Sequence, residues 1–320
     1  MKKIISGIQP SGILHIGNYF GAIQQFIKFQ EENDCLFFVA DYHALTSSSD
    51  ADALRKNTRD VVLDYLALGV DPTKASIFIQ SHIPEHTELM WVLSNLTPMA
   101  LLERGHSFKD KSARGISSNT GLFTYPVLMA ADILMYDIDM VPVGKDQKQH
   151  LEMTRDIATK FNDKYADIFK LPEPMIVEST AVVPGVDGAK MSKSYGNTID
   201  MFASKKILKK QVMSIVTDST PLEDPKDPDN NVTTLYKLFA TPEKLDEMKE
   251  KFRAGNYGYG HAKKELLEAI LEHFAEARTR REELVANPEY VDRILIEGAK
   301  KARATAKAKM IEVKKAVGLI

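Results

Sequence analysis

The sequence predicts an α/β protein in which a parallel sheet with flanking helices is followed by a mostly helical part. Up to about residue 203, short apolar runs bounded by turn residues alternate with helix-length stretches, a pattern typical of a parallel sheet. From about Ser204 the strand-like runs fade and amphipathic stretches take over. We therefore expect two domains, residues 1–203 and residues 204–320.

The elements can be assigned in chain order from this pattern. The first strand is expected at residues 3–8; it ends in the turn-forming Gln9-Pro10-Ser11-Gly12 and is followed by a helical pattern over about residues 16–30. Further strands are expected at 35–40, 75–80 and 140–143, and the C-terminal helical stretches at 205–216, 233–239, 242–253, 261–284 and 288–317. Residues 220–230 are acidic and proline-punctuated, so we expect an exposed loop there.

Composition excludes several kinds of protein. Cys35 is the only cysteine in 320 residues, so a disulfide framework, a multi-cysteine zinc site and a cysteine-bound iron–sulfur cluster are excluded within one chain. No stretch approaches the ~20 apolar residues that a membrane span requires. We expect a protein of the reducing cytoplasm without a membrane partner.

Positive charge gathers at the C-terminal end although the formal net charge is −2. Residues 300–320 carry seven basic side chains against the single acid Glu312: Lys300, Lys301, Arg303, Lys307, Lys309, Lys314 and Lys315. A solvated helix face is the favoured interpretation of this run, and a nucleic-acid-binding face is the alternative.

The turn after the first strand is the first candidate for binding phosphate. Gly12 permits a tight turn, and Gly17 removes a side chain where backbone amides at a helix start could meet an anion. His15 and Asn18 add side-chain donors. Its place after a strand favours a ligand site, because open α/β sheets bind ligands at the carboxyl ends of their strands.

The second candidate is Lys190-Met191-Ser192-Lys193-Ser194, which follows a glycine-containing stretch. Two lysines and two hydroxyl groups on such a loop can close over a triphosphate and relax when pyrophosphate leaves. Taken alone, this segment is better interpreted as a solvent loop with incidental lysines.

Together the two segments resemble the HIGH and KMSKS signatures of class I aminoacyl-tRNA synthetases, here His15-Ile16-Gly17-Asn18 and Lys190 to Ser194. The resemblance continues, in order, through residues 41–46, 108–112, 125–132, 141–150 and 216–219. This set is similar to the bacterial-type tryptophanyl-tRNA synthetases. It implies a Rossmann-like catalytic domain that includes a dimerisation and tryptophan-pocket region, and a helical domain that binds the anticodon.

The expected helix after Tyr125 separates tryptophan from tyrosine as the substrate. Tyr125, Met129 and Asp132 have i, i+4 and i+7 spacing and would share one helix face, with Pro126 in the first turn. A tyrosine pocket of this type would be expected to show glutamine at the position of Met129. A thioether can lie against an indole ring, and Asp132 can accept the indole N–H. A buried core methionine beside an exposed aspartate is the plainer interpretation of the same pattern.

The resemblance implies site residues throughout the chain. Those expected to act on the phosphates are His15, Asn18, Lys111, Lys190 and Lys193. Those expected to contact ATP are Gln9, Pro10, Ser11, Gly17, Asn18, Gly144, Lys145, Asp146, Val183, Lys190, Met191, Ser192, Lys193 and Ser194. Those expected around tryptophan are Ile5, Gln9, His43, Tyr125, Met129, Asp132, Val141, Val143 and Gln147.

The implied reaction is attack of the tryptophan carboxylate on the α-phosphorus of ATP, followed by transfer to the 3′ end of tRNA(Trp). The nucleophile is already charged, so alignment and charge stabilisation suffice. ATP is expected as a substrate with Mg²⁺ held mainly by phosphates and water. Zinc, haem and iron–sulfur clusters are not expected. The partners that the resemblance implies are L-tryptophan, tRNA(Trp) and a second copy in a homodimer.

Several alternatives remain open on the sequence. A tyrosyl-tRNA synthetase, a small-molecule adenylyltransferase and a non-catalytic synthetase-like protein that binds RNA or tryptophan share parts of this pattern. A metal pair at His82 and His86 is rejected because Pro84 lies between them. A P-loop is disfavoured because its glycine–lysine signature is missing from the sequence.

Overall fold

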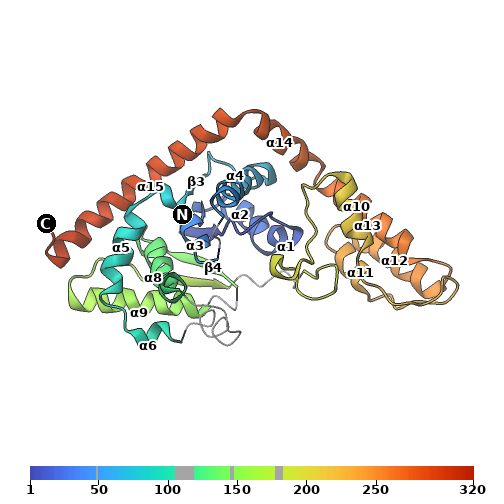
Figure 1. Cartoon of the computed structure of the whole chain (residues 1–320), viewed down its shortest axis with the longest axis horizontal. Coiled ribbons are helices and arrows are strands. Elements are labelled where there is room, and N and C mark those ends of the chain that lie inside the picture. Colours follow the sequence, from blue (N-terminus) through green and yellow to red (C-terminus); the bar gives the residue numbers. More distant parts are fainter. Residues whose placement is uncertain (48–49, 105–118, 145–147, 177–182) are drawn as a thin grey trace. The chain divides into compact units, whose positions relative to one another are not determined.

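The computed structural model describes residues 1–47, 50–104, 119–144, 148–176 and 183–320. Its centre is a parallel sheet of β1 (Lys3–Ile8), β2 (Asp34–Val39), β3 (Ala75–Ile79), β4 (Met140–Val143) and β5 (Glu173–Ile176), shown in Figure 1. The strand order is β3-β2-β1-β4-β5, and the paired strands are parallel. The expected parallel sheet with flanking helices is confirmed.

Four strands were expected and β5 was not. Its sequence Glu173-Pro174-Met175-Ile176 begins with a charge and contains a proline, which is a weak strand signal. Pro174 is tolerated because β5 lies at the sheet edge and pairs only with β4.

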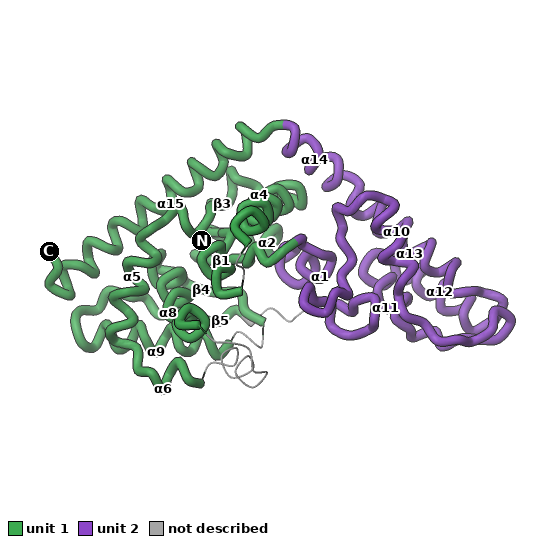
Figure 2. The backbone as a smooth tube through the Cα atoms, in the orientation of Figure 1, with its two compact units in different colours: residues 1–12, 26–178, 287–320 green, residues 13–25, 179–286 purple. Residues whose placement is uncertain are grey.

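The chain forms two compact units (Figure 2). Unit 1 comprises residues 1–12, 26–178 and 287–320, and unit 2 comprises residues 13–25 and 179–286. This division differs from the expected boundary at residue 203. The long C-terminal helix packs against β3 of unit 1, and the backbone N–H of Ile16 donates to the carbonyl of Ile199 at 3.1 Å within unit 2. Contacts between segments far apart in sequence therefore set the units.

Helices of unit 1 surround the sheet. They are α3 (Asp41–Ala44), α4 (Ala51–Leu68), α5 (Glu85–Ser94), α6 (Met99–Leu102), α8 (Thr120–Leu134), α9 (Lys148–Lys164), α15 (Pro288–Val317) and the 3₁₀ turn η2 (Gln80–His82); α2 (Gln24–Phe29) begins in unit 2. The Asp50 carboxylate caps α4 by accepting from the backbone N–H groups of Asp52 and Ala53, and Gly69 ends the helix at a positive φ of 107°.

Unit 2 is mostly helical among the described residues. Its helices are α1 (Ile16–Asn18), the π-helix η1 (Tyr19–Ile23), the 3₁₀ turn η4 (Lys193–Tyr195), α10 (Lys205–Met213), α11 (Asn231–Tyr236), α12 (Pro242–Ala254), α13 (Tyr259–His273) and α14 (Ala275–Ala286). The single helix expected over 261–284 is divided at Phe274, whose ring is buried against Tyr19 and Phe239. Tertiary packing thus overrides a continuous helical pattern.

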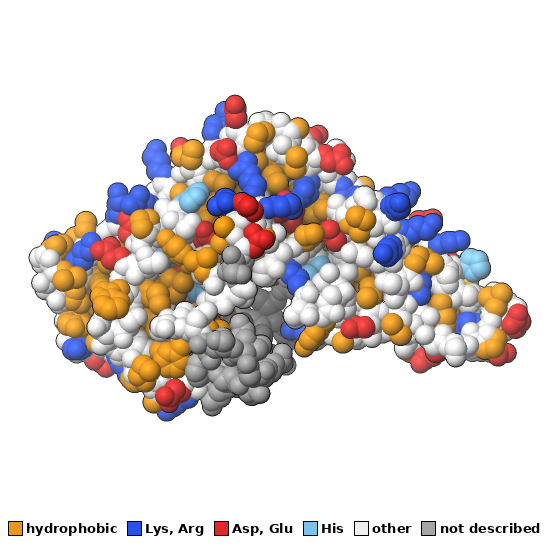
Figure 3. Space-filling model, viewed as in Figure 1, with side chains coloured by type: hydrophobic (Ala, Val, Ile, Leu, Met, Phe, Trp, Pro, Cys, Tyr) orange, Lys and Arg blue, Asp and Glu red, His pale blue; other side chains and the backbone are white. Residues whose placement is uncertain are grey.

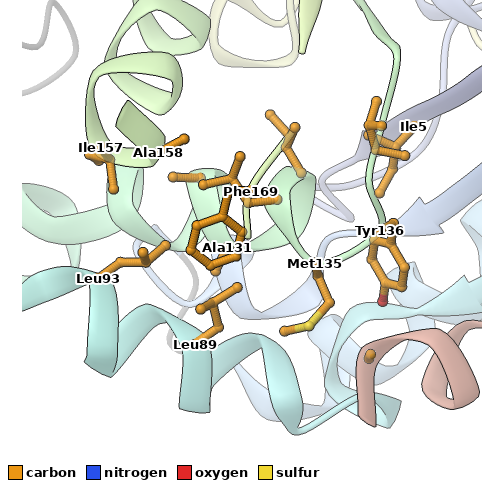
Figure 4. Packing of buried hydrophobic residues seen from close by; sticks show 14 of the residues in the cluster. Ile5, Leu89, Leu93, Ala131, Met135, Tyr136, Ile157, Ala158 and Phe169 are labelled. Carbon is orange, nitrogen blue, oxygen red and sulfur yellow. The ribbon is translucent and has the colours of Figure 1, made fainter. Parts of the chain in front are cut away.

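A hydrophobic cluster between α5, α8 and α9 supports the sheet from one side. Figure 4 shows Leu89 and Leu93 of α5 pointing toward Ala131 of α8 and toward Phe169. Ile5 of β1 and Tyr136, just beyond α8, belong to the same cluster. The cluster therefore fixes α8 relative to β1, the two elements expected to line the amino-acid pocket.

Among the described parts of the chain, no helix is both long and apolar enough to cross a membrane.

Candidate active site

The sheet changes winding direction at β1, because β2 and β3 follow on one side of it and β4 and β5 on the other. β1 and β4 are parallel neighbours, with Ile4 opposite Met140. Ligands of open α/β sheets bind at the carboxyl ends of strands at such a switch point. Gln9 and Ser11 follow β1 and are exposed, Pro10 is buried, and Gly144 follows β4 and is exposed. The Gly12 φ of 128° explains the glycine in this turn.

The α8 helix carries the three residues expected to choose the amino acid. Tyr125 and Met129 are half-buried, and Asp132 is 2% exposed. Ile5, Val141 and Val143 are buried in the same hydrophobic cluster, against which Met129 packs. Unit 1 thus brings together the described members of the expected tryptophan pocket, apart from Gln9, which lies beyond the end of β1.

Pro126 is not in the first turn of α8, and that expectation was wrong. The helix begins at Thr120 after the cap Asn119, whose side chain accepts from the backbone N–H of Leu122 at 2.8 Å. Pro126 therefore lies inside the helix. The cap signal at Asn119 decides the helix start, whereas the sequence interpretation gave more weight to the proline.

The Asp132 carboxylate is held by three side chains. His43 Nε2 lies 2.8 Å from Oδ2, Gln80 Nε2 lies 2.8 and 2.9 Å from Oδ1 and Oδ2, and His86 Nδ1 bonds Oδ1. Burial alone would raise the pKa of this carboxyl. The attraction of His86 and the hydrogen bonds from His43 and His86 together outweigh burial and lower the pKa to about 2. Asp132 is therefore a buried anion, and the alternative of an exposed aspartate is wrong.

Gln80, His86 and Tyr136 were not predicted as site residues. Gln80 and His86 are fully buried, and the Tyr136 hydroxyl lies 2.6 Å from His86 Nε2. The sequence drew attention to His86 only as a rejected metal ligand paired with His82. His82 is exposed and His86 is buried. No residue spacing indicated that His86 would meet Asp132, which is 46 residues away.

The His15 segment forms the start of α1 in unit 2. The backbone N–H of His15 donates to Asn18 Oδ1 at 3.1 Å, so Asn18 closes the helix start. The His15 side chain is 5% exposed, and its Nδ1 has no partner among the described residues. Burial, and to a smaller degree the charge of Lys193, lower the pKa of His15 to about 4. At neutral pH His15 is therefore an uncharged imidazole.

The Lys190 to Ser194 loop is anchored from within. The backbone of Met191 donates to the carbonyl of Val183 at 2.9 Å, and both side chains are buried. Asn197, which is 2% exposed, accepts from the backbone N–H of Ser192 at 2.8 Å and donates to Asp187 and to the carbonyl of Lys190. Lys190 and Ser194 are exposed, and Ser192 and Lys193 are half-buried. The buried Met191 therefore anchors the loop, while Lys190 and Ser194 are exposed to solvent.

Unit 2 brings the two phosphate candidates together. A Cβ added at Gly17 would lie 3.4 Å from the Met191 Cβ, and the Lys193 charge acts on His15. Four expected site residues lie outside the described residues: Lys111, Lys145, Asp146 and Gln147. Among the residues with described positions, no group of three or more His, Cys, Asp or Glu could hold a metal ion.

Replacing Gly17 by alanine should lower the stability of the protein and weaken ATP binding, because it displaces the His15 side chain. The added Cβ would come within 2.9 Å of His15 Nδ1, and the buried ring must move. We expect a loss of about 1–3 kcal/mol in the free energy of unfolding, as for other overpacked sites, and a raised KM for ATP. Urea denaturation and ATP–pyrophosphate exchange measure the two effects. Gly21→Ala is the control, because its Cβ would meet nothing within 4 Å; equal effects of both changes would contradict the prediction.

The fold and these two segments correspond to a known family. The model of class I tRNA synthetases for tryptophan and tyrosine matches residues 1–275. The chain therefore belongs to the class I tRNA synthetases, and its membership makes it an aminoacyl-tRNA ligase.

The relatives narrow this class. The tryptophan–tRNA ligase of Fusobacterium nucleatum is 65% identical, over 100% of this chain and 99% of its own length, and that of Rhodopirellula baltica is 52% identical over 99% of each. The structure of tryptophanyl-tRNA synthetase from Campylobacter jejuni complexed with ADP and tryptophan superposes with a TM-score of 0.94, at 51% identity and 99% coverage of both chains. Within the class, the chain falls in the tryptophan–tRNA ligase family.

Proposed function

We propose that this protein activates L-tryptophan with ATP to tryptophanyl adenylate and pyrophosphate, and then transfers tryptophan to the 3′ end of tRNA(Trp). The observation that carries the choice of amino acid is the buried, ionised Asp132 on the same face of α8 as Met129 and Tyr125. The Campylobacter jejuni relative, complexed with ADP and tryptophan, supports tryptophan and an adenine nucleotide as ligands.

The amino-acid pocket would recognise an indole in two ways. The Met129 thioether and the apolar side chains of Ile5, Val141 and Val143 offer a surface for the ring. An ionised carboxylate only accepts hydrogen bonds, so Asp132 would be the acceptor for an indole N–H, which would otherwise be buried without a partner.

The adenylation step needs positive charge and alignment. The tryptophan carboxylate attacks the α-phosphorus, and the bond to pyrophosphate breaks. Lys190 and Lys193 would stabilise charge on the phosphoryl oxygens, with Lys111 as a further candidate. His15 is uncharged at neutral pH, so with Asn18 it would act as a hydrogen-bond donor. The residues expected to contact ATP include Gln9 to Ser11 and Gly144 to Asp146 in unit 1, and Gly17 and Val183 in unit 2.

Mg²⁺ would arrive with ATP. The described residues offer no group of three or more His, Cys, Asp or Glu that could hold a metal ion. We expect this cation to be held mainly by phosphates and water. It would supply charge neutralisation on the phosphates.

Amino-acid-dependent exchange of pyrophosphate into ATP tests the proposed activity. We expect exchange with tryptophan and at least a hundredfold less with tyrosine at equal concentration. Lys193→Ala should lower the exchange rate by about 10²–10³, as for removal of one charge-stabilising group, while leaving tryptophan binding within threefold. Exchange with neither amino acid would favour the non-catalytic alternative, which binding of tryptophan without turnover would then identify.

The basic run at the C-terminal end divides into structural and exposed side chains. Arg303, Lys309 and Lys314 form ion pairs with Glu85, Asp137 and Glu88. Lys300, Lys307 and Lys315 are exposed and have no carboxylate partner among the described residues. Their spacing places them along one side of α15. Figure 3 shows lysine and arginine side chains along the edge that α15 follows. We propose that this face contacts tRNA phosphates.

Reversing two of these charges should weaken tRNA binding. For Lys300→Glu with Lys307→Glu we expect about a tenfold higher Kd for tRNA(Trp), and a slope of log K against log salt reduced by about two. Filter binding over a salt series measures both, and tryptophan-dependent exchange should not change. Lys160→Glu with Lys164→Glu, on an exposed part of α9, is the matched control. An equal loss in the control would mean that net charge alone is responsible.

An apolar face on unit 1 supports the expected homodimer. Trp91 of α5 is 72% exposed, Met99 is 63% exposed and Leu45 is 57% exposed. A hollow of about 320 Å³ is lined by residues that include Leu45, Tyr125 and Met90, which precedes Trp91 in α5. Figure 3 shows hydrophobic side chains gathered where α5 lies. Such a patch is typical of protein interfaces, and we propose that a second copy covers it.

Trp91→Glu should produce monomers. A charge in the middle of an apolar interface leaves an unpaired, desolvated carboxylate in the dimer. Sedimentation velocity at micromolar protein measures the change. Ile296→Glu on α15, where Ile296 is 62% exposed, should leave the assembly unchanged. Dimers that persist in Trp91→Glu, or a wild-type monomer, would contradict the proposed interface.

The cytoplasmic location stays a prediction.

A further inference from the structure

The hydrogen bonds around Asp132 continue into the interior, away from any expected substrate contact. His86, on α5, is fully buried and uses both ring nitrogens: Nδ1 bonds Asp132, and Nε2 lies 2.6 Å from the Tyr136 hydroxyl. Tyr136 is 1% exposed and packs in the hydrophobic cluster that contains Ile5 (Figure 4). The adenylation step described above does not use His86 or Tyr136.

The direction of each hydrogen bond follows from the charge on Asp132. An ionised carboxylate only accepts, so His43 Nε2, Gln80 Nε2 and His86 Nδ1 each donate. The Gln80 amide is oriented by its other end, because its Oε1 accepts from the backbone N–H of Tyr42 at 3.1 Å. Gln80 therefore cannot turn its amide over without losing a backbone partner.

His86 carries a proton on Nδ1 in this arrangement, because the ionised carboxylate can only accept. Its Nε2 lies 2.6 Å from the Tyr136 hydroxyl, which can both donate and accept. Burial raises the pKa of Tyr136 well above its ordinary value, so that the hydroxyl keeps its proton. A chain of hydrogen bonds therefore runs from Tyr136 through His86 to Asp132.

We propose that His86, oriented by Tyr136, is a positioning residue that fixes the orientation of the Asp132 carboxylate toward a heteroaromatic N–H, and so sets amino-acid specificity. This inference rests on the proposed function, because it assumes that the indole meets Asp132. A carboxylate without the His86 donor keeps His43 and Gln80 but loses one hydrogen bond to Oδ1, so its orientation is fixed less firmly and its charge is stabilised less. Its preference for an N–H donor would then fall.

A tryptophan analogue with sulfur in place of the indole N–H, 3-benzothienylalanine, separates positioning from general packing. Wild type should favour tryptophan over the analogue by at least a hundredfold in kcat/KM for exchange. His86→Phe should raise the KM for tryptophan about thirtyfold, leave kcat and the KM for ATP within threefold, and lower the preference for the N–H at least tenfold. A purely structural role would change tryptophan and analogue by the same factor.

Two further variants make the test independent of folding. His86→Asn keeps an N–H donor near the position of Nδ1 and should restore at least half of the lost preference on a logarithmic scale. Tyr136→Phe removes only one oxygen atom and should lower the preference about threefold; it carries the test if His86→Phe fails to fold. A preference unchanged in both Tyr136→Phe and a folded His86→Phe overturns the proposal, as does the failure of His86→Asn to differ from His86→Phe.

Binding measurements separate this inference from the proposed function. Calorimetry with each ligand gives the same preference without turnover. If wild type binds tryptophan but does not exchange pyrophosphate, the activity is wrong and the binding preference of the variants still decides the role of His86. If wild type binds neither ligand, both proposals are overturned.

Discussion

Replacing Asp132 by asparagine should lower kcat/KM for tryptophan in pyrophosphate exchange by about 10³-fold, or about 4 kcal/mol. The amide would have only one accepting oxygen where the carboxylate now serves His43, Gln80 and His86. Its NH₂ group would face at least one of these donors, and the indole N–H would lose its acceptor. Initial exchange rates over a range of tryptophan concentrations measure the effect.

The same substitution should lower the free energy of unfolding by about 2–4 kcal/mol, because buried donors are left without a partner. Asp156→Asn on the exposed side of α9 is the control and should change neither quantity. If Asp132→Asn keeps tryptophan activation within tenfold of wild type, the indole is not bound by this carboxylate. The specificity would then have to come from the apolar walls alone.

Gly298→Ala is expected to have the largest effect on stability. A Cβ at Gly298 of α15 would lie 1.9 Å from the carbonyl oxygen of Ile77 and 2.8 Å from its carbon. These are backbone atoms of β3, an edge strand of the sheet, so no side chain can turn aside. The helix must move away from the strand, and we expect a loss of 3 kcal/mol or more, at the upper end for overpacked sites.

Urea denaturation of Gly298→Ala and of a matched variant checks this expectation. Gly260→Ala lies in α13, where the added Cβ meets nothing within 4 Å. The same change there should be neutral or stabilise by up to about 1 kcal/mol, the helix propensity of alanine over glycine. A Gly298→Ala protein as stable as wild type would mean that α15 does not approach β3 closely.

The approach of α15 to β3 also protects the sheet. An edge strand has unpaired backbone groups that invite pairing with another chain, and a covering helix blocks that pairing. The sequence interpretation placed residues 288–317 correctly as a helix but assigned them to the second domain. Gly298 was not singled out, because one glycine inside a helical pattern does not identify the strand that it meets.

The sequence suggested site residues where chemistry and local pattern coincide. His15 to Asn18 and Lys190 to Ser194 were paired through a family resemblance, and the structure places both in unit 2. The spacing of Tyr125, Met129 and Asp132 indicated a shared helix face, and α8 confirms the helix. The partners Gln80 and His86 were missed because they come from η2 and α5, and no periodicity relates them to α8.

The sequence by itself determined the α/β class, four of the five strands, most of the helices and the family, because hydrophobic period, turn residues and motifs are local properties. Tertiary structure alone decided which distant segments meet. It built each compact unit from segments that are separated in the sequence, and it brought His86 and Gln80 to Asp132. It also lowered the pKa values of Asp132 and His15. Burial and charge depend on neighbours in space, and those neighbours appear only when the chain is folded.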